Sequence, residues 1–163
     1  IKNGIRLQPQ IHGGLSNSPY RSGTPMLSFV VSLEKALELV LLNIKFHYDY
    51  VSSLNEFFRE NISEYKNIIL NTPKEGSPYI INMSILGCKT IELQKALSDL
   101  DVYVSTKSAC CADNTSSRPV YGITKNRKAA LSTLRISFSH KTTIEEIRGF
   151  LATFEICYRQ LIL

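Results

Sequence analysis

The sequence predicts an α+β domain: a small, mainly antiparallel sheet covered by helices, with a long helix leading into it. Three observations favour this fold. Apolar residues recur at helical spacing after residue 26 and again after residue 142, whereas two short segments alternate apolar and polar residues as strands do. The chain has 163 residues, which is enough for one domain with its own core.

The beginning of the chain divides into a loop and a helix. Residues 1–26 are rich in Gly, Pro, Ser and Asn, so we expect an extended loop there. Apolar residues at helical spacing then predict a long helix from Leu27 to Phe58, with or without one break. We therefore expect two parts, a loop segment at 1–26 and the domain proper at 27–163.

The middle of the chain supplies two strands and a helix. Residues 67–71 and Tyr79–Leu86 read as strands, and the second places Ile81, Met83 and Ile85 on one face. Thr90–Leu100 has the apolar spacing of a helix, and Val102–Ser105 reads as a brief strand.

The last third contains a long loop, a strand and a clear helix. Residues 106–119 are mostly small and polar and read as a loop, and Thr133–Phe138 reads as a strand. Thr142 with Glu145, or Thr143 with Glu146, can form a capping box for the final helix.

Composition excludes several functional classes. The net charge of +5 comes from scattered residues, so we expect no direct nucleic-acid binding. No apolar run approaches the ~18 residues that a membrane span requires, so we expect no membrane partner. The four cysteines lack metal-ligand spacing, which predicts neither a metal site nor disulfides, and reduced thiols indicate a cytoplasmic protein.

Three groups of residues could carry chemistry. Cys110 lies among small polar residues near Lys107, which favours an accessible thiolate, although a loop cysteine can also be incidental. Arg135 interrupts an apolar strand; it could face solvent or bind a carboxylate through two parallel hydrogen bonds. His12-Gly13-Gly14 and Arg21-Ser22-Gly23-Thr24 suit close approach to a phosphate, or simply form a loop before a helix.

The order of these motifs resembles the cysteine desulfurases of the NifS/IscS type, in the class V aminotransferase group. The matching segments are His-Gly-Gly at 12–14, Arg-Ser-Gly-Thr at 21–24, Ile-Asn-Met-Ser at 81–84, Ser-Ala-Cys at 108–110 and Leu-Arg-Ile-Ser at 134–137. The resemblance implies the C-terminal domain of a fold type I pyridoxal-phosphate enzyme, with residues 1–26 on the cofactor side. Such an enzyme acts on L-cysteine, releases L-alanine and passes sulfur to an acceptor protein, often for iron–sulfur cluster assembly.

The resemblance also implies roles for single residues. Cys110 matches the persulfide-forming nucleophile and Arg135 the arginine that binds the substrate carboxylate. Thr24 matches a threonine that reaches the cofactor phosphate of a neighbouring subunit, which implies a homodimer, and Arg21 and His12 match positions near it. The cofactor lysine of such enzymes precedes the His-Gly-Gly segment, so we expect it outside these residues and expect no turnover from this chain alone.

Departures from the pattern leave alternatives open. Lys107 replaces a usual glycine, and Cys111 adds a thiol that could resolve a persulfide or be incidental. One alternative is a selenocysteine lyase or another class V enzyme. Another is a non-catalytic domain that binds an iron–sulfur or tRNA-thiolation partner, for which the basic residues Lys125, Arg127 and Lys128 could serve.

Overall fold

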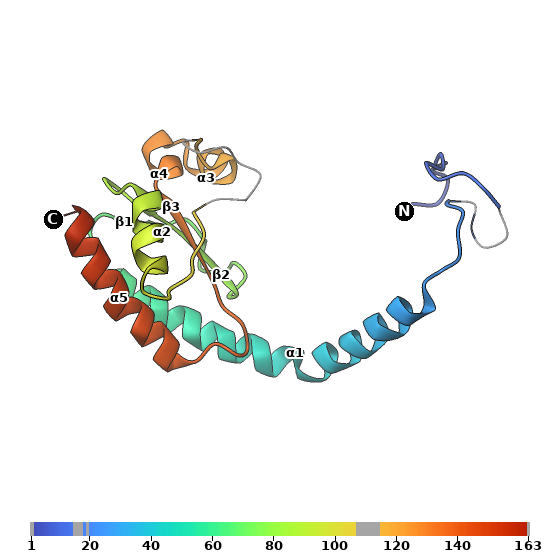
Figure 1. Ribbon diagram of the computed structural model, residues 1–163, viewed down its shortest axis with the longest axis horizontal. Coiled ribbons are helices and arrows are strands. Elements are labelled where there is room, and N and C mark those ends of the chain that lie inside the picture. The colour runs from blue at the N-terminus through green and yellow to red at the C-terminus, as the bar shows by residue number, and fades with distance from the viewer. Residues whose placement is uncertain (1, 15–17, 19, 107–114, 163) are drawn as a thin grey trace. The chain divides into compact units, whose positions relative to one another are not determined.

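The computed structural model describes residues 2–14, 18, 20–106 and 115–162, the last without its side chain. Its elements are α1 (Leu27–Ile62), β1 (Ile68–Leu70), β2 (Ile80–Ile85), α2 (Thr90–Ser98), α3 (Arg118–Thr124), α4 (Arg127–Leu131), β3 (Thr133–Ser137) and α5 (Ile144–Ile162), as shown in Figure 1. The contacts divide the chain into two compact units, Ile1–Asn43 and Ile44–Leu163, and each is described by itself.

The sheet of the second unit has three strands in the order β1-β2-β3, and both pairs are antiparallel. This confirms the predicted fold class and the two main predicted strands. In the β2–β3 register, Ile81 lies opposite Ile136 and Asn82 lies opposite Arg135. Because opposite residues of an antiparallel pair share a face, the sheet has an apolar face and a polar face.

The apolar face forms the core of the second unit. Met83 and Leu134 are fully buried there. The second half of α1 and the helices α2 and α5 cover this face, with α1 and α5 running along it in Figure 1. Their buried side chains include Val51, Leu54, Phe58, Ile62, Leu93, Leu97, Ile147 and Phe154. The strand alternation and the helical spacing together account for this core.

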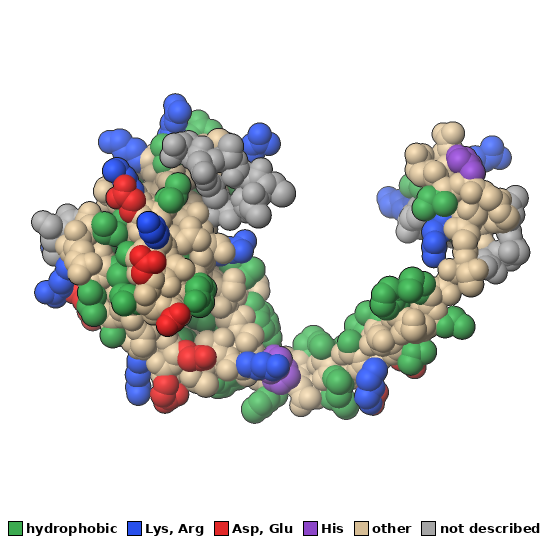
Figure 2. Space-filling view, viewed as in Figure 1, with side chains coloured by type: hydrophobic (Ala, Val, Ile, Leu, Met, Phe, Trp, Pro, Cys, Tyr) green, Lys and Arg blue, Asp and Glu red, His purple; other side chains and the backbone are tan. Residues whose placement is uncertain are grey.

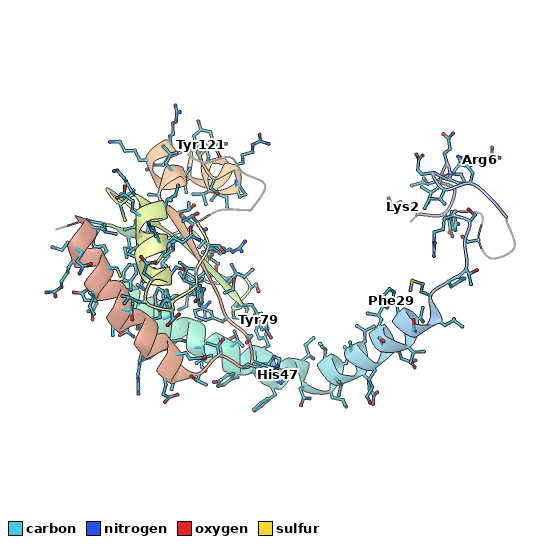
Figure 3. The ribbon with its side chains drawn as sticks, in the orientation of Figure 1. Lys2, Arg6, Phe29, His47, Tyr79 and Tyr121 are labelled. Carbon is cyan, nitrogen blue, oxygen red and sulfur yellow. The ribbon has the colours of Figure 1, made fainter. Side chains whose placement is uncertain are left out.

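The turn between β3 and α5 is fixed to α1. The imidazole rings of His47 and His140 stack with 4.1 Å between their centroids. One helical turn further along α1, the Tyr50 hydroxyl donates a 2.8 Å hydrogen bond to the Thr142 carbonyl. Figure 3 labels His47 on α1 near the start of the part that packs on the sheet.

The capping box at the start of α5 uses the second of the two predicted pairs. The Thr143 hydroxyl accepts a 3.2 Å hydrogen bond from the Glu146 amide, and the Glu146 carboxylate accepts a 2.7 Å bond from the Thr143 amide. Two amides at the helix start, which no carbonyl within the helix can satisfy, are thereby paired.

Substituting Thr143→Ala is therefore expected to destabilise the fold by about 1 kcal/mol. Urea denaturation of the variant measures this loss as a lower midpoint with an unchanged slope. Thr143→Ser is the matched control for the box, because serine keeps the hydroxyl that accepts from the Glu146 amide. An equal or larger loss in the control would contradict the assignment.

Two segments differ from expectation. Residues 102–105 do not form a strand: only Ser105 makes a bridge, to Arg135, and the Gln94 side chain donates to the Val104 carbonyl at 2.8 Å. A side chain therefore occupies a carbonyl that a strand partner would need. The predicted loop also ends early, because α3 begins at Arg118 and accommodates Pro119 in its first turn, where no amide hydrogen is required.

The first half of α1, within the first unit, carries large apolar side chains in contact with solvent. Phe29 is 67% exposed and Leu42 is 72% exposed, and Figure 2 shows green side chains along this part of the helix. Despite these side chains, no helix in the described part of the chain is long and apolar enough to cross a membrane.

Candidate functional site

The polar face of the sheet carries the predicted carboxylate-binding arginine. On β3, Leu134 and Ile136 are buried, whereas Arg135 and Ser137 are exposed on the opposite face. This confirms the predicted direction of each side chain along the strand. Arg135 thus presents its guanidinium away from the core, where an anion can reach it.

Ser105 is bonded to Arg135 through both its backbone and its side chain. The two residues exchange both backbone hydrogen bonds, at 3.1 Å and 2.6 Å. The Arg135 Nη2 also donates to the Ser105 hydroxyl at 3.3 Å. The backbone of Arg135 is therefore paired on its outer side by the residue that stands five positions before Cys110.

The residues on both sides of the Cys110 segment are held by hydrogen bonds. Cys110, Cys111 and Lys107 themselves lie outside the described residues. Before them, the Thr133 hydroxyl donates to the Thr106 carbonyl at 2.6 Å; after them, the Ser117 amide donates to the Ala130 carbonyl at 2.8 Å. The chain thus enters the segment beside Arg135 and leaves it at the end of α4.

An open depression of about 1100 Å³ lies between these flanks. Thr106 and Thr115, one on each side of the Cys110 segment, contribute to its wall. The turn before α2 and Lys128 of α4 complete much of the lining. In Figure 2, basic side chains gather over the α3–α4 end of this unit.

The other two thiols belong to the core rather than to a reactive site. Cys157 is 1% exposed and Cys88 is 8% exposed. Burial, with a smaller contribution from the Glu92 charge, raises the pKa of the Cys88 thiol to about 11, and burial also raises the pKa of Cys157. Since the thiolate is the nucleophile, neither is suited to attack a sulfur atom near neutral pH.

The predicted phosphate-binding residues lie in one loop of the first unit. The Ser22 amide donates to the Ile11 carbonyl at 3.3 Å, which brings the neighbours of His12 and Arg21 together. A Cβ atom on Gly13 would lie 2.8 Å from the Ser22 hydroxyl, so only glycine permits this approach. Thr24 is exposed and lies three residues before the start of α1.

This loop offers donor groups of the kind that hold a phosphate group. Gly23, at φ +104°, brings the backbone close to the Arg21 guanidinium, whose Nη1 lies 3.6 Å from the position of a Gly23 Cβ. Hydroxyl groups, a guanidinium and the amides at the start of α1, which has no acidic residue in its first turn, are typical anion donors.

Among the residues that the structure describes, no three His, Cys, Asp or Glu side chains gather as metal ligands would.

The sequence pattern assigned no site role to two residues of the polar face, Ser105 and Asn82. Ser105 became visible only through its pairing with Arg135, which is 30 positions away. Asn82 stands directly opposite Arg135 on β2 and follows from the strand register. A polar residue within the apolar run of β2 was the available signal for Asn82.

Comparison with known proteins finds a matching family and related sequences. The family model of class-V aminotransferases matches residues 9–150. The cysteine desulfurase IscS of Clostridium botulinum is 33% identical over 155 residues, which cover 90% of this chain and 38% of that protein. A NifS/IcsS protein homolog of Lactobacillus delbrueckii subsp. bulgaricus is 29% identical over 161 residues, with 97% and 42% covered. The chain thus spans about two fifths of the length of these curated relatives.

Solved structures agree with the fold. A NifS-like protein matches with a TM-score of 0.82 and 26% identity, covering 99% of this chain and 41% of the other. The NifS-like protein from Rickettsia africae matches with a TM-score of 0.80 and 23% identity, covering 95% and 41%. Both likenesses extend over nearly the whole of this chain.

Proposed function

Because this chain belongs to the class-V aminotransferase family, we propose that it is the C-terminal part of a cysteine desulfurase. In this proposal the complete protein removes sulfur from L-cysteine and holds it as a persulfide on Cys110. Residues 27–163 are the small domain with its linking helix, and residues 1–26 belong to the cofactor side.

The pairing of Ser105 with Arg135 is the observation that supports this proposal most directly. A guanidinium on the exposed face of β3 is suited to a substrate carboxylate, and the backbone beside it leads into the segment that contains Cys110. A carboxylate receptor and a thiol nucleophile are the two groups that desulfuration of an amino acid requires from this domain.

The chemistry follows from these two groups. Arg135 binds the carboxylate of cysteine and orients the amino acid. Pyridoxal phosphate, when bound, supplies the electron sink that allows the Cβ–S bond of the substrate to break. The Cys110 thiolate attacks the substrate sulfur and forms an S–S bond, while the electron pair of the Cβ–S bond stays on carbon, which takes up a proton to give L-alanine.

The remaining assignments complete the proposal. Thr24 binds the cofactor phosphate across a homodimer interface, with Arg21 and His12 nearby. An acceptor protein takes the persulfide sulfur, and the reduced thiols of the described core fit a cytoplasmic enzyme. The assignments of Thr24, Arg21 and His12 rest on the family and on the donor groups of their loop, and the acceptor protein rests on the family alone.

The proposal is tested with the complete polypeptide that contains these residues. Supplied with L-cysteine, pyridoxal phosphate and a thiol reductant, it is expected to release L-alanine and sulfide in equal amounts, as quantified by chromatography and a sulfide assay. Formation of pyruvate together with sulfide, or of a transaminated product with no sulfide, in place of L-alanine would contradict it.

A further inference from the structure

The side chain of Asn82 lies beside Arg135 in a row that crosses the polar face. In the β2–β3 register, Asn82 is directly opposite Arg135, and Ser105 pairs with Arg135 on its other side. Directly opposite residues have Cβ atoms about 5 Å apart on the same face. A group bound by the guanidinium is therefore within reach of the Asn82 carboxamide.

A chain of hydrogen bonds fixes which end of the Asn82 amide faces outward. The Ala129 carbonyl can only accept, so the Ser84 hydroxyl donates its hydrogen to it, at 2.8 Å. The Ser84 oxygen must then accept from Asn71 Nδ2, at 2.7 Å, and the second hydrogen of that nitrogen goes to Asn82 Oδ1, at 2.8 Å.

The reverse orientation of the Asn71 amide would make fewer hydrogen bonds. If the Asn71 amide were turned over, its oxygen would face a Ser84 oxygen whose only hydrogen is already committed to Ala129. The bond to Ser84 would be lost, and a buried N–H group would take the place of the buried Asn71 Oδ1 that now has no partner. The oxygen of Asn82 therefore faces Asn71.

In this orientation the two hydrogens of the Asn82 nitrogen are not directed at Asn71. Among the described residues, none accepts a hydrogen bond from Asn82 Nδ2, and the side chain is only half-buried. Arg135 also retains donors, since the Ser105 hydroxyl engages only one guanidinium nitrogen. Two adjacent side chains thus offer N–H groups on one face, which suits a ligand with two acceptor oxygens.

We propose that Asn82 is a second carboxylate-binding residue, donating from Nδ2 to the same substrate carboxylate that Arg135 binds. This inference rests on the proposed function. It assigns to β2 a part in substrate recognition, and it gives the Ser84–Asn71 relay the role of holding the Asn82 amide in its donating orientation.

The test uses Asn82→Ala in the complete polypeptide with pyridoxal phosphate. Loss of one hydrogen bond to a charged group is expected to raise the KM for L-cysteine, and the calorimetric dissociation constant of L-alanine, about tenfold. The kcat is expected to stay within about twofold, because the bond is made equally before and during reaction. Asn82→Asp, which turns the donor into an acceptor, is expected to raise both constants further.

Two comparisons separate this role from a merely structural one. Asn61→Ala removes an amide that, within the described part of the chain, bonds to Phe57 of the same helix, and it is expected to leave both constants unchanged. In an Arg135→Met background, Asn82→Ala is expected to have a much smaller effect than in the wild type, because both residues bind one carboxylate.

The possible failures are distinguishable. If Asn82→Ala folds with the thermal midpoint of the wild type and leaves the KM and the L-alanine affinity unchanged, the inference is overturned while the desulfurase proposal stands. If the effects of Asn82→Ala and Arg135→Met on these two constants are fully additive, the two residues do not bind one carboxylate, and the inference is also overturned. If the wild-type protein releases neither alanine nor sulfide from L-cysteine, the proposed function itself fails.

Discussion

Replacing Cys110 by serine is expected to abolish the release of alanine and sulfide from L-cysteine, lowering the rate by about a thousandfold or more. A hydroxyl is far less ionised than a thiol near neutral pH and cannot form a persulfide. The measurement is the rate of alanine formation by the complete polypeptide. Mass spectrometry of the wild-type protein is expected to find the added sulfur on Cys110.

Serine substitutions at the other cysteines are the matched controls. Cys88 and Cys157 are buried thiols with raised pKa values, so their variants are expected to keep persulfide formation. Cys111→Ser tests the neighbouring thiol by the same measurement. Alanine release at the wild-type rate by Cys110→Ser would remove this residue from the mechanism.

Substituting Arg135→Met is expected to lower kcat/KM for L-cysteine by about two to three orders of magnitude. Methionine keeps much of the length of the side chain but removes every donor, so the carboxylate loses a bidentate, charge-assisted pair. Because the side chain is exposed on the polar face, the folded state is expected to keep its stability. Steady-state kinetics and thermal denaturation of the same variant measure the two effects separately.

Two further variants sharpen the role of Arg135. Arg135→Lys keeps the charge but loses the planar fork, and an intermediate kcat/KM is expected. Ser137→Ala changes the next residue on the same face of β3 and is expected to leave kcat/KM within about twofold. A loss from Ser137→Ala as large as that from Arg135→Met would indicate damage to β3 rather than loss of a carboxylate receptor.

The sheet and its core could be predicted because their signals are local. In β2 and β3, alternation of side chains within six residues determines which face is buried, and the structure confirms it for Met83, Leu134 and Arg135. The capping box likewise depends on a local pair, Thr143 and Glu146, within four consecutive residues. Local patterns of this kind are read directly from the chain.

The parts that were missed depend on distant partners or short segments. Residues 102–105 have strand-like composition, but a Gln94 side chain occupies the Val104 carbonyl. The helices α3 and α4 have only seven and five residues, too few for apolar spacing to stand out. Asn126, whose side chain accepts from the Ala129 amide at the start of α4, was an available signal for the second of them.

The candidate site also combines local features, which the sequence predicts, with contacts between distant residues, which it does not. The alternation of β3 predicted the direction in which Arg135 faces, which the structure confirms, whereas its role as a carboxylate receptor was implied by the family resemblance and stays a prediction. The sequence could not predict that Ser105 pairs with it, or that Ser84 and Asn71 orient the Asn82 amide, because these contacts join strands whose register only the fold determines. The sequence shows which residue stands at each position, but not which residue lies opposite it in the sheet.

The hydrogen bonds at Thr106 and Ser117 have an evolutionary consequence. They hold the chain before and after residues 107–114, so insertions or deletions between them leave β3 and α4 undisturbed. Changing the length of chain between two fixed points costs little entropy, about 0.6 kcal/mol for each doubling. If the proposed function holds, relatives of this protein can therefore differ in the length and composition of this stretch, and in the protein that accepts their sulfur, while β3 and Arg135 stay unchanged.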